Sequence, residues 1–198
     1  MFDIEWQKKN FINHVATFQD LGNIKILDFQ NPGHSEYRIR FLFEEDHYRL
    51  HISGDLGDLI AYNFTNMRYE TFGDFVNNTG YFEEKICCHE RSIYFYDYES
   101  AKTELIRNAN EYGWVTDEEI NQEEHDEEIE QLIYEVLEDF NDRTGISQKG
   151  VEALSKYDSD CYEYAYDLGK EPTGILDLYM LAFKLAQEDL ETRIGGEG

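Results

Sequence analysis

Apolar and polar residues alternate with a period of two between residues 24 and 64. The run from Tyr37 to Phe43 shows this best, because its odd-numbered apolar residues are separated by Arg38 and Arg40. Such alternation is typical of a half-buried β-strand. Turn sequences, Asn31-Pro32-Gly33 and Gly54-Asp55-Leu56-Gly57, separate the alternating runs. The pattern therefore predicts an antiparallel meander of three or four strands.

Helical spacing governs most of the remaining chain. Residues 2–18 are expected to form a short amphipathic helix, and two further short helices are expected around residues 69–76 and 81–86. Asp97 is expected to cap a longer helix with Ala101 and Leu105 on its buried face. These elements follow or flank the meander, so the first module is predicted to be α+β.

The clearest helical stripe lies between residues 129 and 140. Its apolar members fall at i, i+3, i+4, i+7, i+8 and i+11: Ile129, Leu132, Ile133, Val136, Leu137 and Phe140. Thr116-x-x-Glu119 resembles a capping box, and Gly145 is a suitable stop. A helix over residues 117–142 would be about 39 Å long, at roughly 1.5 Å per residue.

Two more apolar stripes follow, over residues 151–168 and 175–186. Together they predict an acidic three-helix module beside the α+β module, with Tyr112-Gly113-Trp114 as the joint. We therefore expect an α+β protein of two modules, residues 1–113 and 114–198. The glycine-rich end, from Gly195, is expected to be a flexible tail.

Charge adds a functional expectation to this picture. The formal net charge is −26, and residues 97–142 hold 17 acidic and only two basic residues. Such clustering argues against general adaptation to high salt. Between residues 117 and 142, 13 of 26 residues are Asp or Glu and none is Lys or Arg. On a helix this gives about one charge per ~3 Å, close to the ~3.4 Å of a single DNA strand.

An acidic helix of this kind suits a basic groove that normally holds nucleic acid, so we expect a basic nucleic-acid-binding protein as partner. The same charge predicts no direct binding to nucleic acid or to anionic membranes. The residues expected to contact the partner are Asp117, Glu118, Glu119, Glu123, Glu124, Asp126, Glu127, Glu128, Glu130, Glu135, Glu138 and Asp139. Exposed tyrosines would add specific contacts. The alternative is an acidic scaffold protein that binds a basic partner without blocking DNA.

Metal binding is a second alternative. Cys87 and His89 are the nearest pair of soft ligands, and Cys88 and Cys161 complete the cysteine set. Adjacent cysteines diverge, and zinc usually takes four ligands from spaced pairs. We therefore expect no cofactor, with a structural zinc as the open alternative. Three cysteines do not make a disulfide framework, and no signal sequence is evident, so a cytoplasmic protein is expected. No catalytic signature is evident either, so we expect no enzyme.

Residues 37–105 carry a resemblance. His51-Ile52-Ser53-Gly54-Asp55-Leu56-Gly57-Asp58, Gly80-Tyr81-Phe82-Glu83-Glu84-Lys85-Ile86 and Tyr96-Asp97-Tyr98-Glu99 resemble a module of small phage and prophage proteins of Gram-positive bacteria. Proteins of this kind occur beside type II anti-CRISPR proteins, and the acidic module is similar in character to those inhibitors. The resemblance implies a phage anti-defence protein, acting in the host cytoplasm, that binds a Cas9-type nuclease by DNA mimicry. It carries over no catalytic residue.

Overall fold

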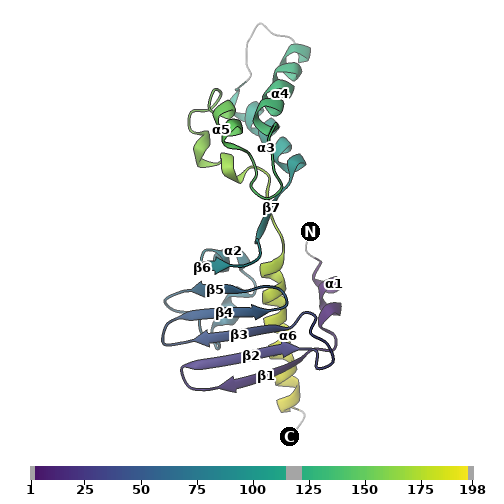
Figure 1. Cartoon of the computed structure of the whole chain (residues 1–198), viewed down its shortest axis with the longest axis vertical. Coiled ribbons are helices and arrows are strands. Elements are labelled where there is room, and N and C mark those ends of the chain that lie inside the picture. Colours follow the sequence, from purple (N-terminus) through teal and green to yellow (C-terminus); the bar gives the residue numbers. More distant parts are fainter. Residues whose placement is uncertain (1–2, 115–121, 196–198) are drawn as a thin grey trace. The chain divides into compact units, whose positions relative to one another are not determined.

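The computed structural model describes residues 3–114 and 122–195 of the 198-residue chain. The chain divides into two compact units (Figure 1). The sheet unit comprises Met1–Ile93 and Gly174–Gly198, and the helical unit comprises Tyr94–Thr173. The chain therefore forms most of the sheet unit, builds the helical unit as an insertion, and returns to complete the first. Six helices and an antiparallel sheet confirm the α+β class for the described residues.

Six of the described strands form one antiparallel sheet in the sheet unit, in the order of the chain. Each strand pairs with the strands before and after it, so the sheet is a simple meander. The strands are β1 (Val15–Asp20), β2 (Ile24–Gln30), β3 (Ile39–Glu44), β4 (Arg49–Gly54), β5 (Leu59–Tyr62) and β6 (Ile86–His89). The predicted alternation between residues 24 and 64 is thereby confirmed as four of these strands.

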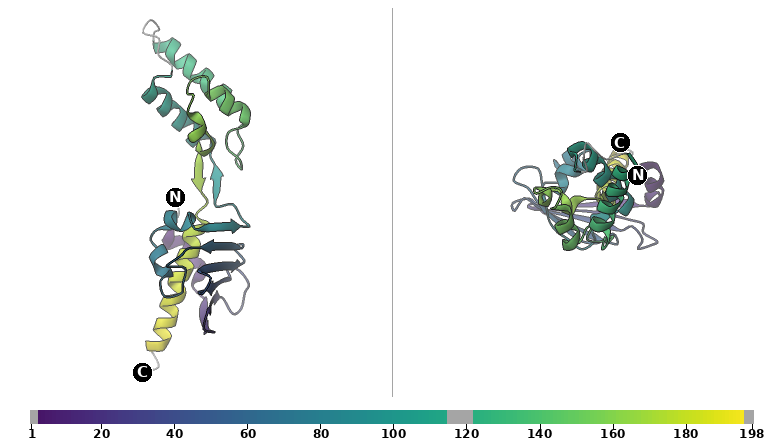
Figure 2. Two further views of the ribbon diagram at one scale, coloured as in Figure 1. Left: turned by 90° about the vertical axis from the view of Figure 1, so that its left-hand side faces the viewer. Right: turned by 90° about the horizontal axis from the view of Figure 1, so that it is seen from above.

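The helices of the sheet unit lie on one face of this sheet, and no described helix of the unit covers the other face (Figure 2). The longest is α6, which packs on β1, β2 and β3. The helical elements of the unit are α1 (Ile4–Lys8), the 3-10 turns η1 (Lys9–Phe11) and η2 (Phe72–Phe75), α2 (Thr79–Glu83) and α6 (Ile175–Gly195).

Aromatic rings fill the space between the sheet and α6. Phe183 of α6 lies at its centre, with ring centroids 4.8 Å from Phe72, 5.4 Å from Phe41 and 6.2 Å from Phe43. All four side chains have no exposed surface. Burying an aromatic ring removes a large apolar area from water, so this cluster contributes much of the unit's stability.

The helical unit packs α3 and α5 against α4, and its two ends pair as short antiparallel strands. Asp97 caps α3 as predicted, accepting a hydrogen bond from the Ser100 N–H at 2.7 Å. The elements of this unit are β7 (Tyr94–Tyr96), α3 (Tyr98–Tyr112), α4 (Gln122–Leu137), α5 (Gln148–Leu154), the 3-10 turns η3 (Cys161–Glu163) and η4 (Ala165–Asp167), and β8 (Lys170–Pro172).

Two predictions about the sheet were wrong. Residues 15–18 belong to β1 instead of an N-terminal helix, because the six residues of Val15–Asp20 pair with β2. The helix ends at Lys8, and three apolar residues of the predicted helix, Ile4, Trp6 and Ile12, are more than half exposed. Ile86, predicted in a helix, begins β6. The sheet therefore has six described strands, where three or four were expected.

The predicted division at residues 113 and 114 also differs from the two units. The third predicted helix is α6, and its apolar face completes the core of the sheet unit. Gly113 caps α3 and Trp114 packs on the helical core, so this segment lies inside one unit. The stripe over residues 151–168 is interrupted after Leu154, where the Asp158 carboxylate accepts from the Asp160 N–H and closes a local turn.

None of the helices in the described ranges is long and apolar enough to cross a membrane.

Candidate acidic binding surface

The helix α4 presents one apolar face to the core of the helical unit. Its buried residues are Ile129, Leu132, Ile133, Val136 and Leu137, each at most 7% exposed. They form one cluster with apolar residues of α3 and α5. The predicted stripe is thus confirmed up to Leu137. Because this face is fixed by packing, the orientation of the opposite, acidic face is fixed as well.

The helix is shorter at its C-terminal end than predicted. It ends at Leu137, and Phe140 packs on the core from the following loop, 5.7 Å from the Tyr98 ring. Asn141 accounts for this end, because its side-chain oxygen accepts from the Arg143 N–H at 2.8 Å and competes with helical hydrogen bonds. The 16 residues of α4 span roughly 24 Å, at ~1.5 Å per residue.

The predicted contact residues fall into three groups. Asp117, Glu118 and Glu119, with the predicted capping box, lie outside the described residues. The backbone of Glu123, Glu124 and Asp126 belongs to α4. The remaining six have described side chains: Glu127, Glu128, Glu130, Glu138 and Asp139 are exposed, and Glu135 is half-buried.

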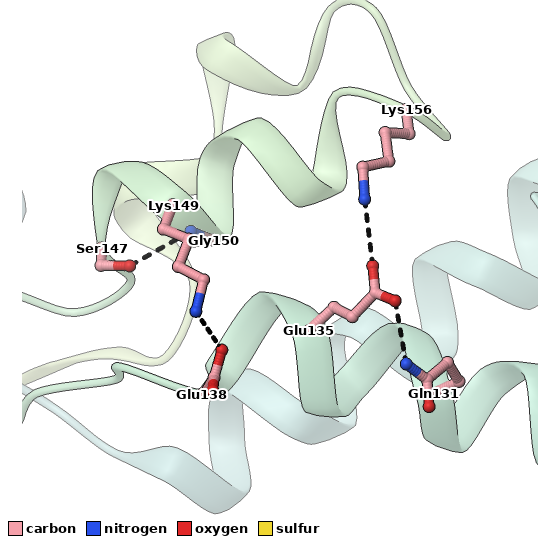
Figure 3. A network of polar contacts seen from close by, with 7 residues as sticks. All are labelled: Gln131, Glu135, Glu138, Ser147, Lys149, Gly150 and Lys156. Atoms are coloured by element: carbon pink, nitrogen blue, oxygen red, sulfur yellow. Dashed lines mark hydrogen bonds and ion pairs between the residues drawn. The ribbon is translucent and has the colours of Figure 1, made fainter.

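Two of these carboxylates already have cationic partners within the helical unit (Figure 3). Lys156 Nζ lies 3.2 Å from Glu135 Oε2, and Gln131 donates to the other oxygen of that carboxylate at 2.8 Å. Lys149 of α5 pairs with Glu138. Hydrogen bonds from Gln131 and Lys156 lower the pKa of Glu135, and the bond to Glu138 raises the pKa of Lys149. Both acids therefore hold α5 and the segment after it beside α4.

The close approach of α5 depends on Gly150. A Cβ atom at this position would lie 2.2 Å from the backbone oxygen of Val136. The Gly150 N–H instead donates to Ser147 Oγ at 3.1 Å, which caps α5 (Figure 3). Lys149 and Lys156 are thereby held within reach of α4. Lys149 and Lys156 are seven residues apart, which is close to two turns of a helix. This spacing was a signal in the sequence, but the residue pattern alone did not pair the lysines with Glu138 and Glu135.

Within α4, Glu127, Glu128 and Glu130 form the uncompensated part of the acidic face, while Asp139 follows the helix and helps to raise the pKa of Lys149. None of these three glutamates makes an ion pair with any residue that the structure describes. Tyr134 lies one turn from both Glu130 and Glu138, and 61% of its surface is exposed. We call these four residues, Glu127, Glu128, Glu130 and Tyr134, the acidic patch.

The net charge is concentrated in the unit that carries the acidic patch. The helical unit has 23 acidic and 6 basic residues, a net charge of −17 in 80 residues. The sheet unit has 20 acidic and 11 basic residues, a net charge of −9 in 118 residues. The strongly acidic character predicted from the sequence therefore coincides with a compact structural unit, although its boundaries differ from the predicted ones.

Three tyrosines lie among the acidic residues of segment 158–167, and one of them is packed while two are exposed. Tyr164 packs on the helical core and donates to Asp158 at 2.8 Å, and burial raises the pKa of its hydroxyl. Tyr162 and Tyr166, on the same segment, are 62% and 48% exposed. Exposed rings beside carboxylates are suitable anchors for a protein interface.

The metal alternative gains no geometric support. Cys87 and His89 are exposed on β6, and His89 Nδ1 lies 2.7 Å from the Arg91 backbone oxygen. Cys88 is exposed next to them, and Cys161 is buried in the core of the helical unit. The described residues include no group of three His, Cys, Asp or Glu side chains arranged to hold a metal ion.

Comparison of the chain with known protein families, with curated proteins and with solved structures finds no match. The site must therefore be interpreted from its own geometry.

Proposed function

We propose that this protein binds a basic, nucleic-acid-binding surface of another protein through its helical unit and thereby excludes the nucleic acid. The partner we propose is a Cas9-type nuclease, in line with the resemblance to phage proteins found beside anti-CRISPR inhibitors. In this proposal the protein acts in the cytoplasm of the bacterial host as a phage anti-defence protein. It acts by occupancy, without catalysis.

The observation that carries the proposal is the acidic patch on a fixed helix. Glu127, Glu128 and Glu130 have no cation beside them among the described residues, while the opposite face of α4 is buried. Carboxylates that have no cation beside them, held on a folded helix, can attract the arginines and lysines of a partner electrostatically. A loose acidic tail would lose more conformational entropy on binding.

The internal ion pairs narrow the set of acids that we assign to the interface. Glu135 and Glu138 support the packing of the unit through Lys156 and Lys149. We assign them to the edge of the interface, where a partner arginine would have to compete with an existing lysine. Tyr134, between Glu130 and Glu138, supplies a rigid ring on which a guanidinium group can stack.

Affinity capture tests the proposal. The full-length chain is immobilised and incubated with a Cas9-type nuclease carrying its guide RNA, at several salt concentrations. We expect a complex whose affinity falls steeply with salt, because both surfaces release counterions when they meet. Absence of a salt-sensitive complex across several such nucleases would reject the proposed partner.

The scaffold alternative makes a different prediction for the same complex. A scaffold protein that binds away from the nucleic-acid groove would form a complex that still accepts target DNA. A competitor would not. Addition of target DNA to the captured complex therefore separates the two functions, since the DNA releases the nuclease only from a competitor.

A further inference from the structure

A polar hollow of about 160 Å³ lies on the sheet unit, whereas the acidic patch belongs to the helical unit. Its lining comes from three adjacent strands and the residue before β3: Asp28, Gln30, Arg38, Arg40, Ser53 and Gly54. All of these residues except Gly54 alternate with buried ones such as Phe29, Ile39 and Ile52, so their side chains belong to the face of the sheet opposite α6. No described helix of the unit covers this face (Figure 2).

The hollow is cationic although the chain carries a net charge of −26. Arg40 binds both oxygens of Asp28, from Nε at 2.6 Å and from Nη2 at 2.9 Å, and so neutralises that carboxylate. The guanidinium group of Arg38 has no hydrogen bond or ion pair with any described residue. The side chains of Gln30 and Ser53 also lack a described partner. One net positive charge and several free donors therefore surround the hollow.

The backbone around Arg38 is held in an unusual conformation. Tyr37, the preceding residue, has a φ of 57°, in the left-handed region. Its N–H donates to Asp55 Oδ2 at 3.0 Å, and its oxygen lies 3.2 Å from His14 Nε2. A non-glycine residue keeps such a conformation only where its surroundings impose it, and such residues cluster at functional sites.

Gly54 completes this arrangement on the neighbouring strand. It has a φ of 139°, and a Cβ atom there would lie 2.1 Å from the backbone oxygen of Arg38. That oxygen instead accepts from the Asp55 N–H at 2.9 Å. Arg38 is therefore fixed by its backbone alone, and its side chain remains available for a ligand.

We propose that this hollow binds a phosphate group, either free or as the monoester of a small molecule. Arg38 precedes β3 and Arg40 lies two residues further on in that strand, about 7 Å away between Cα atoms. The free guanidinium group of Arg38 and the Nη1 group that Arg40 does not use on Asp28 can therefore approach one tetrahedral anion. Guanidinium donors match phosphate oxygens in geometry and charge. The volume holds a phosphate group and few further atoms, since one water molecule occupies about 30 Å³. The high negative charge of the chain disfavours nucleic acid as the source of the phosphate.

Titration of the isotope-labelled full chain with inorganic phosphate, followed by NMR at low ionic strength, tests this site. We expect saturable shifts of backbone amides confined to residues around the hollow, including Ser53 and Gly54. The variant R38Q should bind at least about tenfold more weakly, because it loses a charge-assisted pair of hydrogen bonds. Its fold should be retained, since the described hydrogen bonds of Arg38 involve only its backbone.

The matched control is R49Q. Arg49 lies on β4, on the same face of the sheet, is exposed and does not line the hollow. It should bind phosphate as the unmodified chain does. Equal weakening in both variants, or shifts that do not saturate, would overturn the proposal. S53A gives a second test, with an expected loss of severalfold, if R38Q alters the spectrum throughout.

Two further ligands identify the anion. If glycerol phosphate binds with the same affinity as inorganic phosphate, the site is assigned to monoesters. If glycerol phosphate binds more weakly, the site is assigned to free phosphate. Acetate should bind more weakly than both. If acetate binds as tightly, the assignment to phosphate is wrong.

Discussion

Lys156 Nζ lies 3.2 Å from the carboxylate of Glu135, and this pair ties the segment after α5 to the last turn of α4. The lysine neutralises a carboxylate that the sequence assigns to the partner interface. The acidic face of α4 is therefore divided between acids that hold the unit together and acids that remain free.

This division predicts the pH dependence of the Lys156→Ala variant. The pKa of Glu135 is lowered in the folded protein, so the pair stabilises the fold above the usual carboxyl pKa of 4.5, and this contribution is lost as the pH falls through the lowered value. We expect the variant to be slightly less stable than the unmodified chain near pH 7, and this difference to be smaller near pH 3. Urea denaturation at both pH values measures this.

Lys184→Ala is the control for the change in net charge. Lys184 is exposed on α6 and has no described ion pair. A stability difference at pH 7 that is the same for both lysine variants would show that the Glu135 pair contributes nothing specific.

The contact between α4 and α5 predicts a large effect of Gly150→Ala. The added Cβ would meet the Val136 backbone oxygen, so the helices must separate, at a cost of about 1–3 kcal/mol. Trp6 and Trp114 are the two tryptophans of the chain and lie in different units. In a Trp6→Phe background, Trp114 fluorescence therefore reports the unfolding of the helical unit alone.

Gly80→Ala in α2 is the matched helical control. Gly80 lies in the sheet unit and no atom lies within 4 Å of the added Cβ, so we expect this variant to leave the unfolding midpoint reported by Trp114 unchanged. If the two glycine variants show the same unfolding midpoint, the close contact between Gly150 of α5 and the Val136 oxygen of α4 is contradicted.

The edge of the sheet is closed at Ala16 by α6. Asp189 accepts a hydrogen bond from the Ala16 N–H at 2.8 Å, and Arg193 donates to the Ala16 oxygen. Open strand edges invite pairing with other chains. We expect Asp189→Ala to lower the free energy of unfolding by about 1–3 kcal/mol, because it leaves the Ala16 N–H without its partner.

The variant should also increase concentration-dependent association, measured by sedimentation. Glu191→Ala, two residues further along α6 and exposed, removes the same charge without touching β1. Association that rises equally in both variants would point to net charge as the cause, and the edge contact would then have no protective role.

Tyr134 and Tyr162 allow a test of the aromatic part of the acidic patch. Both belong to the helical unit and are 61% and 62% exposed, but only Tyr134 lies on α4. We expect Tyr134→Ala to weaken binding to the nuclease by about tenfold, as is usual for an interface anchor, and Tyr162→Ala to have little effect. The reverse order would place the interface on the segment around η3 instead of on α4.

The sequence pattern predicted the elements whose stability is local. The alternation around Phe41, the Asp97 cap and the Ile129–Leu137 stripe are properties of single segments, and all three are present in the structure. The strand β1 was missed because Val15 and Phe18 also fit a helical stripe with Phe11, and only pairing with β2 decides between the two. The return of α6 to the sheet depends on Phe183 meeting Phe72, a contact between distant segments that no local pattern encodes.

The candidate site was predictable in composition and less so in detail. The acids of α4 could be placed on its exposed face from the periodicity of the apolar residues. The lysines that neutralise Glu135 and Glu138 come from another element, so their effect required the packing of α5. The cationic hollow around Arg38 depends on the register of three strands and on the backbone of Tyr37, and neither follows from the residue pattern.

The most direct test of the account is competition for a Cas9-type nuclease between labelled target DNA and three forms of this protein. The first form is the unmodified chain, and the second carries Glu127→Lys, Glu128→Lys and Glu130→Lys. The third carries the same charge changes at Glu36, Asp74 and Glu191, which are exposed residues of the sheet unit. We predict that the first and third forms displace the DNA and that the second does not. Displacement by the second form as effective as by the other two would contradict the proposal that the acidic patch occupies the nucleic-acid-binding surface.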